Sequence, residues 1–233
     1  MIRQAAQEFF NYIKNPDPFT KKDADKLFYN QLFPLVMICL FFAIGSSAFV
    51  SQLEQLKWIR HLPEFRLFDI KERKIYLFLT VVFGAPLLEE IIFRYQLKNW
   101  YLAFLCWAIV AALVFKIIIP SKPFISIIIA LIIITIPFYF KTKASQRIAF
   151  IQKSFKYHFY STAIVFGLLH VSNYDEPLQY GWAVVLLVLP QLFIGFALGY
   201  VRMRFGLKNA MLLHAAYNFI PALSLLAGYG NMN

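Results

Sequence analysis

The 233-residue sequence contains only two cysteines, Cys39 and Cys106, and both lie inside apolar runs. Two isolated thiols at this separation provide neither a disulfide framework nor the paired spacing of a metal site. The sequence also has no HExxH motif, the helical signature of zinc proteases. We therefore interpret both cysteines as small apolar side chains that fill space between helices.

Acidic residues are scarce, because 12 Asp and Glu stand against 23 Lys and Arg, for a formal net charge of +11. In a soluble protein such a charge would suggest nucleic-acid binding. Here the basic residues flank long apolar runs, as in proteins whose loops contact anionic lipid headgroups. We therefore expect the lipid bilayer as a partner, and no nucleic acid.

From its composition and patterning we expect no secretory signal peptide, soluble domain, internal repeat or low-complexity segment. Its first 28 residues mix Lys, Asp and Phe, and no small-residue cleavage site follows a short apolar core. We expect residues 1–28 to form a cytoplasmic or interfacial segment, with a short interfacial helix over 17–33. Residues 29–228 are then one transmembrane domain, and 229–233 a short tail.

Hydrophobic residues are abundant, at 60% of the chain, with 18% aromatic residues and a mean hydropathy of +0.61. A soluble domain has about 45–50% apolar residues. The apolar runs are continuous rather than alternating, which favours helices over the strands of a barrel. Since about 20 helical residues cross a bilayer, the sequence predicts an all-α, polytopic transmembrane bundle of about seven spans, between six and eight. A bacterial protein of this kind would lie in the plasma or inner membrane.

The expected spans cover residues 29–50, 75–99, 100–119, 123–140, 157–171, 178–204 and 208–228. Pro190 is expected to kink the sixth of them. The positive-inside rule places the basic segments 141–156 and 202–208 in the cytoplasm and the acidic loop 172–177 outside, so that the N-terminus is inside and the C-terminus outside. The basic loop 51–74 then falls outside, against the rule. This leaves open a re-entrant first span or a different number of spans.

Three ionisable residues occur together within an apolar stretch, in "PLLEEIIFR". Such residues cost about 2.5–3.5 kcal/mol each at membrane depth, so they usually face a cavity and have a function. Glu90 and Arg94 are spaced i, i+4 and can pair on one helix face, whereas Glu89 points about 100° away. A second carboxylate without its own cation is a candidate general base or acid. The alternative is a buried ion pair that only fixes helix packing.

Two histidines lie in other apolar stretches, "FGLLH" and "MLLHAAYNF". His170 follows Phe166 by one turn, so the ring can pack beside the imidazole, and Gly167 allows close helix approach. Otherwise His170 binds only a neighbouring backbone carbonyl. His214 and Asn218 share one helix face and offer two hydrogen-bond donors, as a developing oxyanion requires. Otherwise they are polar contacts between helices.

The positions of these groups along their helices are similar. At about 1.5 Å per residue, Glu89, His170 and His214 lie at comparable depths from the cytoplasmic ends of their spans. We therefore expect them to meet in one pocket, about a third to half of the way across the membrane. By contrast, His61 and His158 lie in or near basic loops and are expected to be solvated.

The three stretches match the patterns EExxxR, FxxxH and HxxxN. In this order, each in an apolar helix, they resemble the CPBP family of intramembrane proteases, which includes the CAAX prenyl endopeptidases and the bacterial Abi-type, bacteriocin-processing-type proteins. The resemblance covers residues 76–100 and 155–228. Two further spans separate the first two motifs, an even insertion that keeps both motifs on the same side of the membrane.

The resemblance implies an intramembrane endopeptidase that hydrolyses a peptide bond of a membrane-associated substrate, of the CAAX type or the leader-peptide type. It implies that Glu89 with His170 activates a water, and that His214 with Asn218 stabilises the oxyanion. The supporting residues would be Glu90, Arg94 and Phe166.

Three alternatives stay open. The family has also been described as metalloproteases, and Glu89, His170 and His214 would supply a two-histidine, one-carboxylate set for zinc. We favour the metal-independent glutamate mechanism. The chain could also be a non-proteolytic immunity or scaffold protein of the same fold. The last alternative is a small transporter or proton-linked carrier, since Glu, His and Arg also build proton relays, although the sequence shows no inverted repeat.

Overall fold

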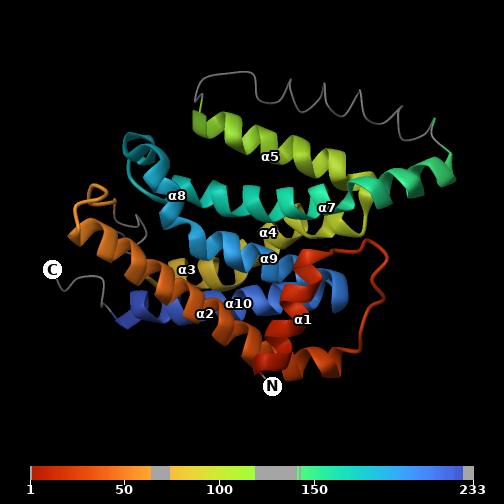
Figure 1. Ribbon diagram of the computed structural model, residues 1–233, viewed down its shortest axis with the longest axis horizontal. Helices are drawn as coiled ribbons and strands as arrows, with labels where there is room; N and C mark the ends of the chain where they lie inside the picture. Colours follow the sequence, from red (N-terminus) through yellow and green to blue (C-terminus); the bar gives the residue numbers. More distant parts are fainter. Residues whose placement is uncertain (1, 64–73, 119–140, 142, 228–233) are drawn as a thin grey trace.

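The computed structural model describes residues 2–63, 74–118, 141 and 143–227 (Figure 1). The regular elements in these ranges are helices, and no strand occurs among them, which confirms the all-α prediction for this part of the chain. The longer helices are α1 (Ile2–Lys14), α2 (Asp25–Gln55), α5 (Ala103–Ile118), α7 (Ala144–Leu169), α9 (Leu189–Arg204) and α10 (Leu207–Ala227).

Shorter helical pieces complete the fold. The expected second span is built from α3 (Lys74–Leu79), the π-helical turn η2 (Thr80–Gly84), α4 (Ala85–Phe93) and the 3-10 turn η3 (Tyr95–Leu97). The remaining pieces are η4 (Trp100–Leu102), η5 (His170–Asn173), η6 (Pro177–Ala183) and α8 (Val184–Leu187).

Within the described residues, two helical segments are long and apolar enough to cross a membrane, Asp25–Gln55 and Lys74–Leu97. A third is added if η6–α8 and α9 form one broken span, bent by 45°. Pro190 lies in the first turn of α9, directly after this break, so the predicted kink is confirmed. The number of about seven spans is not confirmed by the described residues, and the span expected at 123–140 lies outside them.

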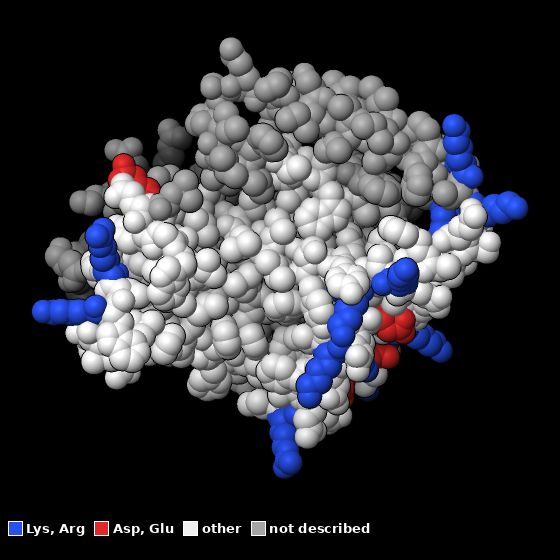
Figure 2. Space-filling model, turned by 45° about the horizontal axis from the view of Figure 1, so that its top comes forward, with Lys and Arg blue, Asp and Glu red and all other residues white. Residues whose placement is uncertain are grey.

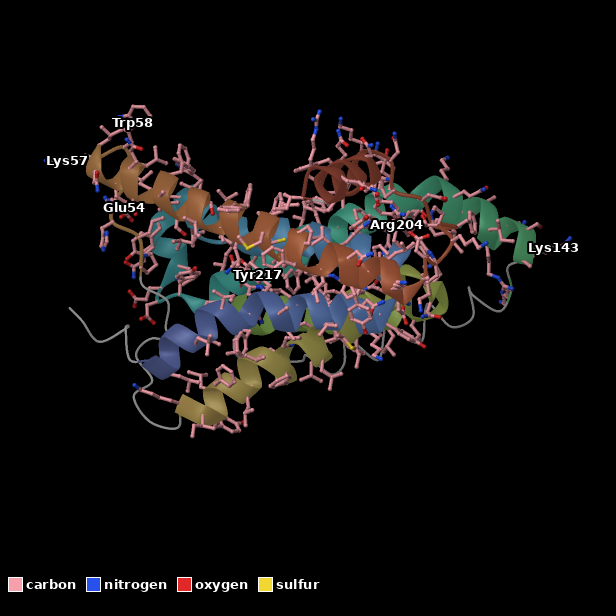
Figure 3. The ribbon with its side chains drawn as sticks, turned by 90° about the horizontal axis from the view of Figure 1, so that it is seen from below. Glu54, Lys57, Trp58, Lys143, Arg204 and Tyr217 are labelled. Carbon is pink, nitrogen blue, oxygen red and sulfur yellow. The ribbon has the colours of Figure 1, made fainter. Side chains whose placement is uncertain are left out.

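α2 continues for 31 residues without a break and is long enough to cross a membrane, which favours a complete first span over a re-entrant one. At its far end Val50 packs with Leu62 and Ala183, which places the loop after α2 beside η6. Figure 3 shows Lys57 at one end of the bundle and Lys143 at the other. Both ends of the bundle therefore carry basic side chains. For this reason the positive-inside rule did not give the loop 51–74 a side of the membrane that agrees with the other loops.

A broad uncharged surface separates the charged groups. Figure 2 shows Lys and Arg side chains at opposite edges of the visible face, with uncharged residues between them. On α2, the side chains of Phe33, Phe41 and Ile44 are more than 60% exposed. An apolar band between charged ends is what a lipid environment requires.

The core of the bundle surrounds α9, which packs against α1, α2, α7 and α10 (Figure 1). Its residues Ala197, Leu198 and Tyr200 are fully buried. Close approach of α7 and α9 depends on Gly167, as the sequence predicted, because a Cβ atom there would lie 2.8 Å from the backbone nitrogen of Leu192.

The N-terminal helix differs from the expectation. Residues 15–24 contain no regular helix, and the helical segment that precedes them is α1. The interfacial helix predicted over 17–33 is therefore wrong, since its second half is the beginning of α2. Pro16 and Pro18 explain the interruption, because proline lacks the backbone N–H and disfavours a helical residue before it.

α1 is fastened to the end of α9. Phe9 is fully buried and packs edge-on against Phe193. Arg204 Nη1 donates to Glu8 Oε2 at 2.9 Å, and Arg204 Nε donates to Asp23 Oδ2 at 2.8 Å. The N-terminal segment is thus held against the same helix that forms one wall of the cavity described below.

The two histidines outside the motifs have different environments. His61 is exposed, as predicted. The prediction for His158 is wrong: this residue is only 9% exposed, and Trp107 Nε1 donates to its Nδ1 at 3.2 Å. The reason is that α7 begins at Ala144, which places His158 in the middle of a packed helix, beside Trp100, rather than at a helix end.

The packing of α7 on α9 yields a first prediction. We expect Gly167→Ala to lower the free energy of unfolding by about 1–3 kcal/mol, the usual cost of overpacking, because the added methyl group meets the side chain and the backbone nitrogen of Leu192. Thermal unfolding in detergent measures this change. Gly45→Ala is the matched control, since nothing lies within 4 Å of its added Cβ. An equal change in unfolding free energy for the two variants would contradict the close contact between Gly167 and Leu192.

Candidate active site

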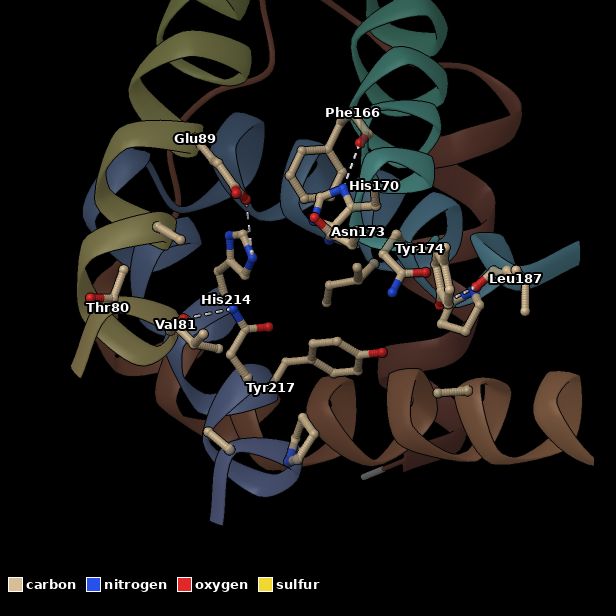
Figure 4. Close-up of a pocket in the computed structure, with 18 of the residues that line it drawn as sticks. Thr80, Val81, Glu89, Phe166, His170, Asn173, Tyr174, Leu187, His214 and Tyr217 are labelled. Atoms are coloured by element: carbon tan, nitrogen blue, oxygen red, sulfur yellow. Dashed lines mark hydrogen bonds and ion pairs between the residues drawn. The ribbon is translucent and has the colours of Figure 1, made fainter. Parts of the chain in front are cut away.

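A cavity of about 560 Å³ lies between the helices that contain the three motifs (Figure 4). Glu89 on α4, His170 at the end of α7, and His214 and Asn218 on α10 all line it. The predicted meeting of these groups in one pocket is therefore confirmed. Their catalytic roles stay predictions.

The two adjacent glutamates have different environments, as the helix geometry predicted. Glu90 is completely buried, and its Oε2 lies 3.7 Å from Arg94 Nε. The side chain of Glu89 is 28% exposed and faces the cavity. Glu89 is therefore the carboxylate that a water or a substrate can reach.

His214 lies between the two carboxylates, which the sequence did not predict. Its Nδ1 lies 3.1 Å from Glu90 Oε1, and its Nε2 lies 3.7 Å from Glu89 Oε2. Since a carboxylate accepts hydrogen bonds, Nδ1 donates its proton to Glu90. The ring of His214 is thereby held in one orientation, with Nε2 toward Glu89.

Arg94 is buried at the centre of this arrangement. Its guanidinium carbon lies 4.2 Å from the centre of the Phe166 ring. Its Nη2 donates to the carbonyl of Gly195 on α9 at 3.1 Å. Arg202, also on α9, donates from Nε to the backbone carbonyl of Arg94 at 2.9 Å. A buried cation is tolerated when it has such partners, and here they join α4, α7 and α9.

Phe166 is in contact with both histidines. Its ring centre lies 4.8 Å from that of His170 and 5.7 Å from that of His214. The predicted packing of Phe166 beside His170 is confirmed, and the contacts with Arg94 and His214 are additional. One aromatic ring therefore limits the positions of three polar side chains.

The hydrogen bond of His170 determines its tautomer. His170 Nδ1 lies 2.8 Å from the carbonyl oxygen of Phe166. A carbonyl oxygen only accepts, so Nδ1 carries the proton, and the lone pair of the neutral ring is on Nε2. His170 does bind a neighbouring backbone carbonyl, as the alternative interpretation of this residue required. Because that bond uses Nδ1, Nε2 of the same ring is left to accept a proton.

Asn218 is held by the π-helical turn η2. Its Nδ2 donates to the carbonyl of Val81 at 3.0 Å. A π-helical turn changes the register of backbone hydrogen bonds and is frequent at functional sites. Because the amide group is planar, this bond fixes the direction of the second N–H of Asn218.

The comparison with protein families identifies the chain. The model of the type II CAAX prenyl endopeptidase Rce1-like family matches residues 71–220, well over half of the chain. The chain belongs to this Rce1-like family. The match contains all three motifs, and it confirms the resemblance to the CPBP intramembrane proteases. No curated protein and no solved structure matches the chain.

The Rce1-like family is a family of proteases, so membership indicates a peptidase. Together with the apolar helices, it also indicates an integral membrane protein. A CAAX protease family further suggests that the substrate is associated with the membrane.

The cavity of this Rce1-like protein is also lined by polar residues that the sequence analysis did not identify. They are Ser47, Thr80, Asn173, Tyr174, Gln191 and Tyr217. Asn173 and Tyr217 follow the two motif histidines by three residues, a spacing that places residues on neighbouring parts of one helix face. That spacing could have identified them. Gln191 had no such signal, because only the bend before α9 brings it to the cavity.

The zinc alternative requires Glu89, His170 and His214 to surround one ion. In the described part of the Rce1-like chain, no three His, Cys, Asp or Glu side chains are grouped so that they could hold a metal ion. The imidazole of His214 is directed at two carboxylates instead. The donor set as arranged does not fit zinc, and no step of the proposed reaction uses a metal.

The buried ion cluster yields a second prediction. We expect Arg94→Met to lower the free energy of unfolding by about 3–5 kcal/mol, because it leaves Glu90 buried without its cation. The double variant Glu90→Gln with Arg94→Met should lose less, since it removes both charges. Thermal unfolding in detergent compares the two. If the loss of unfolding free energy in the double variant equals the sum of the losses in Glu90→Gln and Arg94→Met, the pairing of the two residues is contradicted.

Proposed function

We propose that the protein is an intramembrane endopeptidase that hydrolyses a peptide bond of a membrane-associated, CAAX-type substrate. The observation that supports this most directly is the cavity, in which the reachable carboxylate of Glu89 faces the same space as His170, His214 and Asn218. Membership of a peptidase family favours hydrolysis over the immunity, scaffold and transporter alternatives.

In the proposed first step, Glu89 and Nε2 of His170 accept hydrogen bonds from one water. The water oxygen attacks the scissile carbonyl carbon while its proton moves to Glu89. The carbonyl π bond breaks, and its electron pair becomes the oxyanion of a tetrahedral intermediate. Both acceptors are available for this, since Glu89 is exposed to the cavity and the Nδ1 proton of His170 is held by Phe166.

His214 and Asn218 stabilise the oxyanion in this proposal. The second N–H of Asn218 is one donor, while the first remains bound to Val81. Nε2–H of His214, in its protonated form, is the other, with Nδ1–H bound to Glu90. Donors that are already oriented before the charge develops lower the barrier most.

In the last step the intermediate collapses. The C–N bond breaks, the proton on Glu89 moves to the leaving nitrogen, and a carboxylic acid and an amine are formed. Glu90, Arg94 and Phe166 do not react in this proposal. They hold His214 and His170 in place through the contacts described above.

The decisive experiment uses purified protein in nanodiscs and a synthetic prenylated peptide. We expect Glu89→Gln to reduce kcat about 10²–10⁴-fold, because the general base is lost. Glu176→Gln, at an exposed position outside the cavity, is the matched control. Cleavage by Glu89→Gln at the wild-type rate would show that the assigned base is wrong. A parallel assay with a strong chelator tests the metal-independent mechanism, which predicts an unchanged rate.

The oxyanion role yields a further prediction. We expect Asn218→Ala to reduce kcat about 10²–10³-fold with little change in KM, since the donor acts mainly in the transition state. Steady-state kinetics on the same peptide measures both constants. An increase in KM with unchanged kcat would instead assign Asn218 to substrate binding.

A further inference from the structure

Gln191 is a cavity residue to which neither the motifs nor the proposed mechanism assigns a role. It lies in the first turn of α9 and lines the cavity. Its Oε1 is buried and has no hydrogen-bond partner. Buried acceptors without a partner are rare in folded proteins, because losing the bonds to water is unfavourable.

Among the cavity-lining residues that the structure describes, Gln191 alone has such an atom. Other buried atoms without a hydrogen bond have a different explanation or a different location. Those of Glu90 and Arg94 belong to the ion cluster, where the two groups face each other. Those of Gln96, Trp100 and His158 lie on residues outside the cavity lining.

The position of Gln191 on α9 directs it toward the site. Gly195, four residues later, accepts the hydrogen bond from Arg94, and residues four apart share one helix face. Ile194 lines the cavity as well. The bend between α8 and α9 therefore presents one turn of α9, with an unpaired amide oxygen, beside the residues proposed to be catalytic.

We infer that Gln191 is a substrate-positioning residue whose Oε1 accepts a hydrogen bond from a backbone N–H of the bound peptide. This inference rests on the proposed peptidase function and extends it. A peptide substrate suits the observation, because an extended backbone offers N–H donors at regular intervals, whatever its side chains. The bond would align the chain relative to Glu89 without taking part in the reaction.

The test combines a variant with a modified substrate. Each backbone N–H near the scissile bond is replaced in turn by an ester oxygen, with the scissile amide kept, and kinetics are measured for wild type and Gln191→Leu. We expect one ester position to raise the wild-type KM about tenfold, the typical effect of one lost hydrogen bond. Gln191→Leu should raise KM for the parent peptide by the same factor, and should be insensitive to that ester.

Two controls accompany this test. Gln52→Leu makes the same substitution at an exposed position of α2, away from the cavity, and should leave both constants unchanged. Gln191→Met, which keeps the length of the side chain, is measured beside Gln191→Leu in case leucine disturbs folding. Thermal unfolding of each variant separates a folding defect from a binding defect.

The possible results are distinct. If Gln191→Leu leaves KM unchanged, or if the ester effect persists in full in the variant, a water rather than substrate satisfies Oε1 and the inference is overturned. Absence of any sensitive ester position in the wild type overturns it as well. If wild-type protein cleaves no peptide at all, the proposed function itself fails.

Discussion

The arrangement of the site depends on the buried carboxylate of Glu90. Its two oxygens face Arg94 and His214, so a single side chain connects α4 to α10 and positions one of the cavity histidines. An unpaired carboxylate would be very unfavourable in this apolar interior, so both partners are required. Because Arg94 and Nδ1 of His214 face Glu90, the neighbouring carboxylate of Glu89 has only Nε2 of His214 nearby, at 3.7 Å, and lines the cavity.

The remaining contacts extend this constraint to the other helices. Arg94 is bound to α9 through Gly195 and lies over the ring of Phe166, which in turn packs against His170 and His214. Each helix that supplies a motif is therefore in contact with the others through a polar or aromatic side chain. Such a connected site can keep donors and acceptors in position before a substrate arrives, which electrostatic stabilisation of a transition state requires.

Much of this was accessible from sequence because helical periodicity is regular. The spacing of Glu90 and Arg94 predicted their pairing, and the neighbouring position of Glu89 predicted its different environment. The glycine after Phe166 predicted the close approach of α7 and α9. Sequence failed for His158 and for the N-terminal helix, where the boundaries of helices decide the environment. Boundaries depend on local interruptions such as Pro16 and on packing, and a hydropathy run does not show them.

By itself, the sequence determined that the chain is helical, apolar and basic, and that three ionisable motifs recur in apolar segments, since these properties follow from residue type and spacing. Only the tertiary structure decided which partners the motifs have. The position of His214 between two glutamates, the bond from Asn218 to Val81 and the presence of Gln191 at the cavity join residues far apart in the chain. Such contacts depend on how helices are rotated and bent against one another, which is set by packing rather than by the periodicity of any single helix.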